Sequence, residues 1–167
     1  DGISLEREKL NELKALANYT IDTSDCSAKK LKEKIVGIFT GEGEKNLYVN
    51  VVSFGFKYGV PTDSDFMFDV RFLPNPFYID ELKQKTGNDK EVFDYVMGLD
   101  GAKEFVEKIT NLFLDIIPSF EKEGRNQIVV AIGCTGGQHR SVTIAIELAR
   151  MLREHRYNVI LEHRELE

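Results

Sequence analysis

The sequence predicts an α/β fold with a mixed, largely parallel sheet and helices packed on it. Residues 128–132 (IVVAI) form a continuous apolar run, which is typical of a strand buried on both faces of a parallel sheet. Strand-like runs of this kind alternate with segments of helical periodicity along the chain, and that alternation favours a layered α/β architecture. With 167 residues, the chain is long enough to bury a substantial core.

Composition narrows the class of protein. Hydrophobic residues make up 42% of the chain and charged residues 30%, which is ordinary for a soluble globular protein. A net charge of −6 argues against a generally basic, nucleic-acid-binding surface. The two cysteines, Cys26 and Cys134, form no disulfide framework, and no apolar run reaches the roughly 18 residues that span a bilayer. We therefore expect a cytoplasmic protein without a membrane partner.

The first part of the chain predicts two helices. Residues 4–17 place leucines at helical spacing, and residues 19–21 form a short strand candidate. Residues 22–25 (DTSD) offer N-caps for a second helix, whose apolar stripe runs from Leu31 to Phe39. The stretch TGEGE at 40–44 then looks like a linker. We expect a boundary there, with residues 1–40 belonging to one domain and residues 41–167 to another.

The second part predicts a complete α/β unit. Four segments that are apolar or rich in β-branched and aromatic residues are expected to be strands, at 47–54, 66–73, 128–132 and 157–161. Helices are expected between residues 79 and 120, with breaks near 86–89 and 98–101, and again from about 141 to 154.

The segment that links the buried strand to the last helix carries most of the predicted chemistry. Its sequence is Cys134-Thr135-Gly136-Gly137-Gln138-His139-Arg140-Ser141. Backbone N–H groups at a helix start attract anions, and glycines let a ligand approach the backbone. Arg140 offers a planar fork of donors for phosphate, while the hydroxyls of Thr135 and Ser141 and the ring of His139 add others. The pattern predicts a binding loop for a phosphorylated small molecule.

Two other interpretations of this loop stay open. Gly136-Gly137 can be only a tight turn, with Arg140 pairing with a surface carboxylate. The spacing Cys-x-x-Gly-x-x-Arg-Ser is also similar to the phosphate loop of cysteine-dependent phosphatases, in which a thiolate attacks phosphorus. Cys134 and Arg140 would then be catalytic. Gly133 stands where those enzymes usually have histidine, so we expect binding without turnover and assign no catalytic residue.

A second cluster surrounds the predicted strand at 66–73. Asp69 and Arg71 are two residues apart and would share one face of that strand. Asp69 could accept a hydrogen bond from a sugar hydroxyl or amine while Arg71 supports an anionic group, or the two could form a structural ion pair. Asp63 and Asp65 are too few ligands for a metal, so no metal site is expected. His155 and His163 lie among charged residues, and both are expected on a solvated face.

Three motifs give the chain a strong resemblance to the RapZ/YvcJ family of bacterial nucleotide-binding proteins. They are residues 53–59 (SFGFKYG), 68–76 (FDVRFLPNP) and 133–142 (GCTGGQHRSV), in that order. The resemblance covers nearly the whole chain. It implies that residues 1–40 are the tail of the family's N-terminal P-loop domain, and that residues 41–167 are its C-terminal domain.

The resemblance implies a sensor of a phosphorylated amino sugar, such as glucosamine-6-phosphate. The family's pocket corresponds by matching position to Asp69, Arg71, Cys134, Thr135, Gly136, His139 and Arg140. ATP or GTP is expected only in the full-length protein, because this chain has no Walker A stretch. The family also implies a homo-oligomer, a small RNA and a ribonuclease as partners. Gln138 replaces a lysine found in some relatives and the chain end lacks a basic run, so the RNA is the less expected partner.

Overall fold

The computed structural model describes residues 47–166 and, before them, residues 10, 21, 23, 27, 28, 31 and 35. The chain divides into two compact units, Asp1–Glu44 and Lys45–Glu167, and each is described by itself. In the first unit Leu10, Leu31 and Ile35 are helical, while Ile21 belongs to no strand. The rest of the predicted N-terminal helices and strand, together with Cys26, lies outside the described residues.

The second unit is built on a four-stranded sheet, with strands β1 (Tyr48–Gly55), β2 (Phe66–Asp69), β3 (Gln127–Cys134) and β4 (Asn158–His163). The strand order is β2-β3-β1-β4, and every pair is parallel. The predicted α/β fold is confirmed, with a sheet that is parallel throughout the described strands. Because parallel strands end at the same edge, the register sets Gly55 beside Cys134 and Asp69 beside Gly133.

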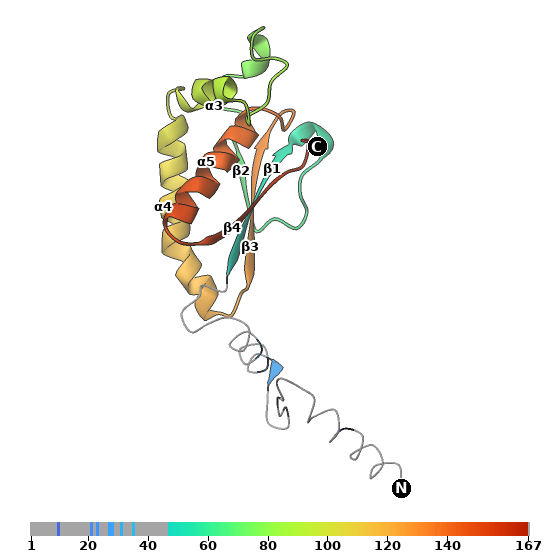
Figure 1. Cartoon of the computed structure of the whole chain (residues 1–167), viewed down its shortest axis with the longest axis vertical. Helices are drawn as coiled ribbons and strands as arrows, with labels where there is room; N and C mark the ends of the chain where they lie inside the picture. Colours follow the sequence, from blue (N-terminus) through green and yellow to red (C-terminus); the bar gives the residue numbers. More distant parts are fainter. Residues whose placement is uncertain are drawn as a thin grey trace. The chain divides into compact units, whose positions relative to one another are not determined.

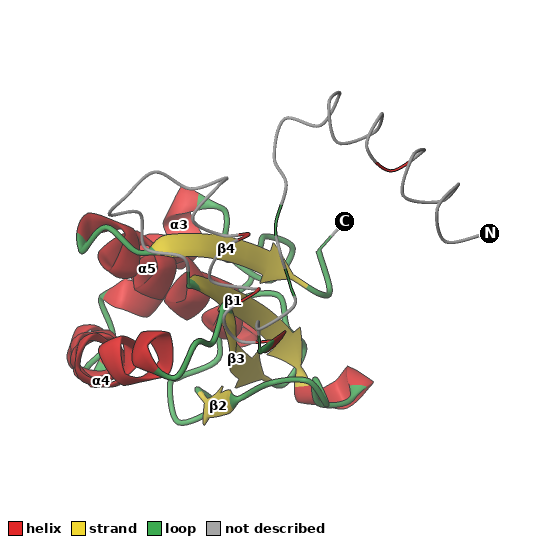
Figure 2. Ribbon diagram, turned by 90° about the horizontal axis from the view of Figure 1, so that it is seen from below, coloured by secondary structure: helices red, strands yellow, loops and turns green. Residues whose placement is uncertain are grey.

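Three helices cover one face of this sheet: α3 (Lys90–Met97), α4 (Ala102–Lys122) and α5 (Arg140–Glu154) (Figures 1 and 2). Helix α5 lies directly against β1, β3 and β4, and it contacts both α3 and α4. Alternate residues of β1 show the two sides of the sheet. Val49 and Val51 are buried in the cluster shared with the helices, while Val52 lines a cavity with Val60 and Pro61, in the segment that follows β1.

The core between sheet and helices is mainly aliphatic, with aromatic side chains of α4 and β2 packed against each other at one edge. Phe113 of α4 is fully buried, and its ring meets the edges of Phe66 and Phe68 from β2 at centroid distances of 5.3 and 6.1 Å. Such edge-to-face contacts add to the stabilisation from burial. They fix α4 across the short edge strand, so the end of β2 is held in place. In the part of the chain that the structure describes, no helix is long and apolar enough to cross a bilayer.

Two predicted elements are shorter than the sequence suggested. The strand expected at 66–73 ends at Asp69, and residues 70–73 form a turn in which the Leu73 N–H donates to the Val70 carbonyl. The helical region expected from residue 79 begins only at Lys90, because residues 80–89 form successive turns. The breaks near 86–89 and 98–101 are confirmed on either side of α3.

Candidate functional site

The predicted loop lies at the carboxyl edge of the sheet, between β3 and the first turn of α5. Neighbouring segments hold its backbone at two points. The Thr135 carbonyl accepts from the Lys57 N–H at 3.1 Å, and the Gln138 carbonyl accepts from the Gly87 N–H at 2.8 Å. A Cβ at Gly87 would lie 2.6 Å from the His139 carbonyl oxygen, so only glycine permits this close packing. The loop is therefore fixed by the segments that follow β1 and precede α3.

Cys134 organises the inside of the loop. Its Sγ lies 3.1 Å from the Ser141 Oγ and accepts from the Gly137 N–H at 3.2 Å. Cys134 and Ser141 are both buried. The sulfur thus ties the end of β3 to the turn and to the first residues of α5. Sequence analysis placed Cys134 and Ser141 in one loop, and the structure brings their side chains into contact.

Gly133 is a glycine for a packing reason. A Cβ there would lie 2.5 Å from the Phe54 ring and 2.6 Å from the Phe56 ring. The two rings meet edge to face, with their centroids 4.8 Å apart. A histidine, as cysteine-dependent phosphatases have at this position, would not fit without moving these aromatics.

Gly136 and Gly137 have different surroundings. Gly137 has φ +73°, a left-handed conformation that favours glycine, and a Cβ there would lie 2.8 Å from the Gly55 nitrogen. At Gly136 a Cβ would meet nothing within 4 Å among the described residues. Gly137 is needed by the fold, whereas Gly136 leaves open space above the loop. This open space is where a ligand could approach the backbone.

Arg140 is almost completely buried, with 4% of its surface exposed. Its Nη1 donates to the carbonyls of Leu73 and Arg71 at 2.7 and 3.2 Å, and its Nη2 donates to the Thr135 hydroxyl at 3.2 Å. Its Nε is buried and has no partner within the described structure. Arg140 therefore joins the turn after β2 to the loop with most of its donors, and it keeps Nε for another acceptor.

His139 is also buried, with 6% of its surface exposed, and its Nε2 has no partner among the described residues. Burial lowers the pKa of this imidazole, although backbone groups of Leu82 and Lys85 act in the opposite direction. The ring is therefore mainly neutral near pH 7. A buried polar atom without a protein partner calls for an acceptor or donor from outside the protein, such as water or a ligand.

Asp69 and Arg71 meet at the end of β2 and form a bidentate ion pair. The Arg71 Nε donates to Asp69 Oδ1 at 3.0 Å, and its Nη2 lies 2.6 Å from Oδ2. Hydrogen bonds from Arg71 hold the pKa of the Asp69 carboxyl below its usual value. The guanidinium also lies 4.1 Å from the centre of the Phe56 ring. The expected pairing is present, but Arg71 lies in the turn rather than on the strand.

Some predicted residues have other positions or roles. Asp65 is part of the sheet framework, because its carboxylate accepts from the Val129 N–H and from Arg125, each at 2.8 Å. Within the described residues no three His, Cys, Asp or Glu side chains gather as a metal site requires. His155 is exposed, but the expectation of a solvated face was wrong for His163, which is half-buried and lies 2.8 Å from the Ser53 Oγ.

Sequence reasoning missed one acidic residue at the loop, Glu165. Its Oε2 accepts from the Gly55 N–H at 3.0 Å, and a Cβ at Gly137 would lie 2.9 Å from its Cδ. No local pattern could reveal this contact, because it depends on β4 pairing in parallel with β1 and carrying the following residues to the same edge of the sheet. A carboxylate therefore lies against the backbone of the predicted anion loop.

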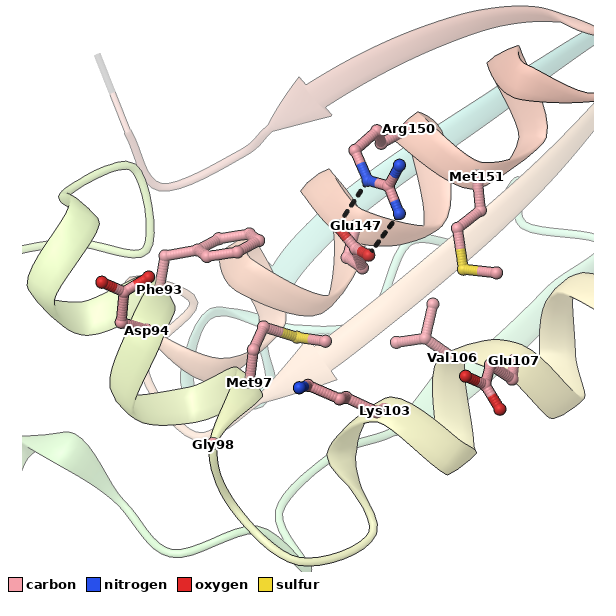
Figure 3. Close-up of a pocket in the computed structure, with 10 residues that line it drawn as sticks. All are labelled: Phe93, Asp94, Met97, Gly98, Lys103, Val106, Glu107, Glu147, Arg150 and Met151. Carbon is pink, nitrogen blue, oxygen red and sulfur yellow. Dashed lines mark hydrogen bonds and ion pairs between the residues drawn. The ribbon is translucent and has the colours of Figure 1, made fainter.

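A cavity of about 380 Å³ lies elsewhere, between α3, α4 and α5 (Figure 3). Apolar side chains line part of it, and the charged residues around it include Arg150, which is paired with Glu147. The Lys103 ammonium points away from Glu107, the acid four residues further along α4 (Figure 3). None of the predicted loop residues lines this cavity.

The amino-acid sequence matches one family of known proteins. The family model described as the RapZ C-terminal domain matches residues 47–167. Among curated proteins, a nucleotide-binding protein of Clostridium acetobutylicum is 54% identical over 169 aligned residues, covering 100% of this chain and 58% of the relative. Nucleotide-binding proteins of Alkaliphilus oremlandii and Caldanaerobacter subterraneus are 52% and 49% identical, each over 99% of this chain. The chain spans 57% and 59% of the length of these two relatives. The chain thus belongs to the family defined by the RapZ C-terminal domain.

Proposed function

We propose that this chain is a regulatory module that binds a phosphorylated amino sugar, such as glucosamine-6-phosphate, in the loop 134–141. The observation that carries the proposal is a fixed loop at the start of α5, open above Gly136, with two buried nitrogens beside it that lack protein partners. These nitrogens are Arg140 Nε and His139 Nε2. A helix N-terminus and a guanidinium are both suited to phosphate.

The second contact set would come from Asp69 and Arg71. They stand at the end of β2, and the Arg71 carbonyl itself accepts from Arg140. Side chains of both are nearly half exposed, so a ligand on the loop could reach them. Arg71 would reach an anionic group and Asp69 a hydroxyl or amine. In this arrangement the ligand is held at two ends.

Calorimetric titration with glucosamine-6-phosphate, glucosamine and inorganic phosphate tests the proposal. We expect saturable binding of the intact phosphosugar that is much tighter than binding of either half. Arg71→Ala should weaken it by about 1.5–3 kcal/mol, the range for a hydrogen bond to a charged group. Arg150→Ala is the matched control, because Arg150 is an exposed arginine, paired with Glu147 and Glu154, in the part of α5 far from the loop. Equal binding of phosphate alone would reduce the site to a general anion loop.

A cysteine-dependent phosphatase is the second candidate, because Ser141 Oγ and the Gly137 N–H both approach the Cys134 sulfur as stabilising donors would. The Cys134 thiolate would attack phosphorus, forming an S–P bond as the P–O bond to the leaving alcohol breaks, and Arg140 would hold the phosphoryl oxygens. Water would then hydrolyse the phosphocysteine and release phosphate. The test is release of phosphate from p-nitrophenyl phosphate by the wild-type chain and by Cys134→Ser. No release at high protein concentration would end this idea.

We place the module in a longer nucleotide-binding protein that controls amino-sugar and cell-envelope precursor metabolism in the cytoplasm. Residues 1–40 would be the end of its P-loop domain, and ATP or GTP would be bound by that domain. Homo-oligomerisation, a small RNA and a ribonuclease would belong to the same protein. An RNA adaptor predicts a gel shift that weakens steeply with salt, and the net charge of −6 argues against tight binding by this chain alone.

A further inference from the structure

The residues that follow β4 are fastened to the carboxyl end of β1. The Arg164 N–H donates to the Ser53 carbonyl at 3.1 Å, and the Arg164 Nη1 donates to the Gly59 carbonyl at 3.3 Å. His163 Nδ1 lies 2.8 Å from the Ser53 hydroxyl. These contacts fix the backbone just before Glu165, so the position of its carboxylate is set by the sheet.

The Glu165 carboxylate faces the loop without a charged partner of its own. Its one hydrogen bond within the described residues comes from the Gly55 N–H, and none of them forms an ion pair with it. Burial raises the pKa of this carboxyl, with Gly55 and Arg164 acting in the opposite direction. Asp69 differs, because Arg71 already compensates its charge. Of these two acids, Glu165 is the one whose charge is left for a ligand to compensate.

A fixed carboxylate beside an anion loop affects different ligands differently. It repels a bound phosphate, and this repulsion is stronger in a partly buried site than in water. A phosphorylated ligand that also carries an ammonium group offsets the repulsion through its own positive charge. Phosphates of sugars without an amine have no such group, so they experience the full repulsion.

We propose that Glu165 is a specificity-determining residue that makes the loop favour phosphorylated ligands carrying an ammonium group over otherwise similar phosphates without one. The inference rests on the proposed function and deepens it, because it assigns recognition of the amine to Glu165 and leaves Asp69, which is already paired with Arg71, to accept from a hydroxyl. The close approach of this carboxylate to the loop requires glycine at position 137, because a Cβ there would collide with the Glu165 carboxylate.

The test compares the dissociation constants of glucosamine-6-phosphate and glucose-6-phosphate in the wild-type chain and in Glu165→Gln. Glutamine keeps an oxygen to accept from the Gly55 N–H and removes the charge. We expect a wild-type preference for the amino sugar of at least about tenfold, which corresponds to about 1.4 kcal/mol. In Glu165→Gln the preference should fall at least threefold, chiefly because glucose-6-phosphate binds more tightly.

Glu162→Gln is the matched control, because Glu162 is an exposed residue of β4 and loses the same charge. Glu162→Gln should keep the wild-type preference for the amino sugar. A Glu165→Asp variant keeps the negative charge and should retain part of that preference. Glu165→Ala provides a second variant if glutamine disturbs the fold. An unchanged preference in both Glu165→Gln and Glu165→Ala would overturn this inference alone. If the wild-type chain bound neither glucosamine-6-phosphate nor glucose-6-phosphate, the proposed function and this inference would both be overturned.

Discussion

Gly136 and Gly137 illustrate at the residue scale how two identical neighbours can serve different purposes. A methyl group at Gly137 would meet the Gly55 nitrogen and the Glu165 carboxylate, and the backbone there has a positive φ. A methyl group at Gly136 would enter open space. Gly136 thus leaves room for the ligand, whereas Gly137 is needed for the stability of the loop.

The glycine pair leads to a paired mutational prediction. Gly137→Ala should lower the free energy of unfolding by about 1–3 kcal/mol, because a strained conformation and a close contact are both involved. Gly136→Ala should leave stability within about 0.5 kcal/mol and weaken glucosamine-6-phosphate binding instead. Urea denaturation and calorimetry measure the two effects. Equal losses of stability in both variants would contradict the assignment.

His139 provides a prediction about pH. Burial lowers the pKa of its imidazole in the folded state, so the unfolded chain binds the proton more readily. This contribution to stability is fully present above about pH 6.5, the unfolded pKa, and it is lost as pH falls toward the folded pKa. Between pH 7.5 and 5, the wild type should lose more stability than His139→Gln.

The control for this measurement is Leu112→Ala, which changes an exposed side chain of α4 that carries no titratable group. It should retain the wild-type dependence on pH. The raised pKa of Glu165 acts in the opposite direction, but it is common to all three proteins and cancels in the comparison. Identical pH profiles for wild type and His139→Gln would contradict a lowered pKa of this imidazole in the folded state.

Arg140 shows why single residues could be predicted only in part. The sequence correctly indicated a donor-rich loop, because glycines, hydroxyls and an arginine follow a buried strand within eight residues. It could not show that three Arg140 donors would be used by Leu73, Arg71 and Thr135. Thr135 is close in sequence, but Leu73 and Arg71 lie on a turn 67 and 69 residues away, and only the pairing of β2 with β3 brings them close.

At the scale of elements, β2 is shorter than its sequence suggests because of a local side-chain hydrogen bond. Residues 66–73 alternate in a way that favours a strand, yet the Asp69 carboxylate accepts from the Arg71 N–H at 2.9 Å. This bond between residues two apart stabilises a turn in place of a continued strand. The hydrophobic periodicity correctly predicted that a strand is present, whereas the hydrogen bond between Asp69 and Arg71 determines where the strand ends.

The helical spacing of apolar residues in α5 predicts an inward face at Val142, Ala145, Ile146, Ala149 and Leu152. The structure buries a wider face, including Ile144 and Leu148 completely, while Ile146 is only half-buried. The reason is that α5 packs against the sheet on one side and against α3 and α4 on others. A single amphipathic stripe underestimates the burial of a helix that is enclosed in this way.

This enclosure predicts that α5 is sensitive to cavities. Leu148→Ala should lower the free energy of unfolding by about 2–5 kcal/mol, the range for a large-to-small change in a packed core. Ile160→Ala on β4 is the control, because Ile160 is 50% exposed, and it should cost less than about 1 kcal/mol. Urea denaturation measures both. Similar losses at the two positions would mean that α5 is packed more loosely than the structure shows.

At the scale of the whole molecule, the described core closes within the second unit. Its buried cluster runs from Leu47 to Tyr157 and joins β1 and β3 to α3, α4 and α5, while partly buried residues of β2 and β4 pack against it. The predicted α/β class and the order of the later elements followed from alternation of apolar runs along this part of the chain. The strand order β2-β3-β1-β4 did not, because it depends on which distant strands pair.

A core that closes within Lys45–Glu167 predicts that this fragment folds without the preceding residues. Its melting temperature should lie within about 4 °C of the full chain, because a loss of 1 kcal/mol shifts a domain of this size by about that amount. Its affinity for glucosamine-6-phosphate should also be unchanged, since every residue assigned to the site lies between Gly55 and Glu165. Thermal denaturation and calorimetry on the fragment and the full chain make the comparison.

A fragment that melts at a much lower temperature would show that residues 1–44 contribute to the stability of the second unit. A fragment that folds normally but binds more weakly would instead show that the first unit completes the ligand site.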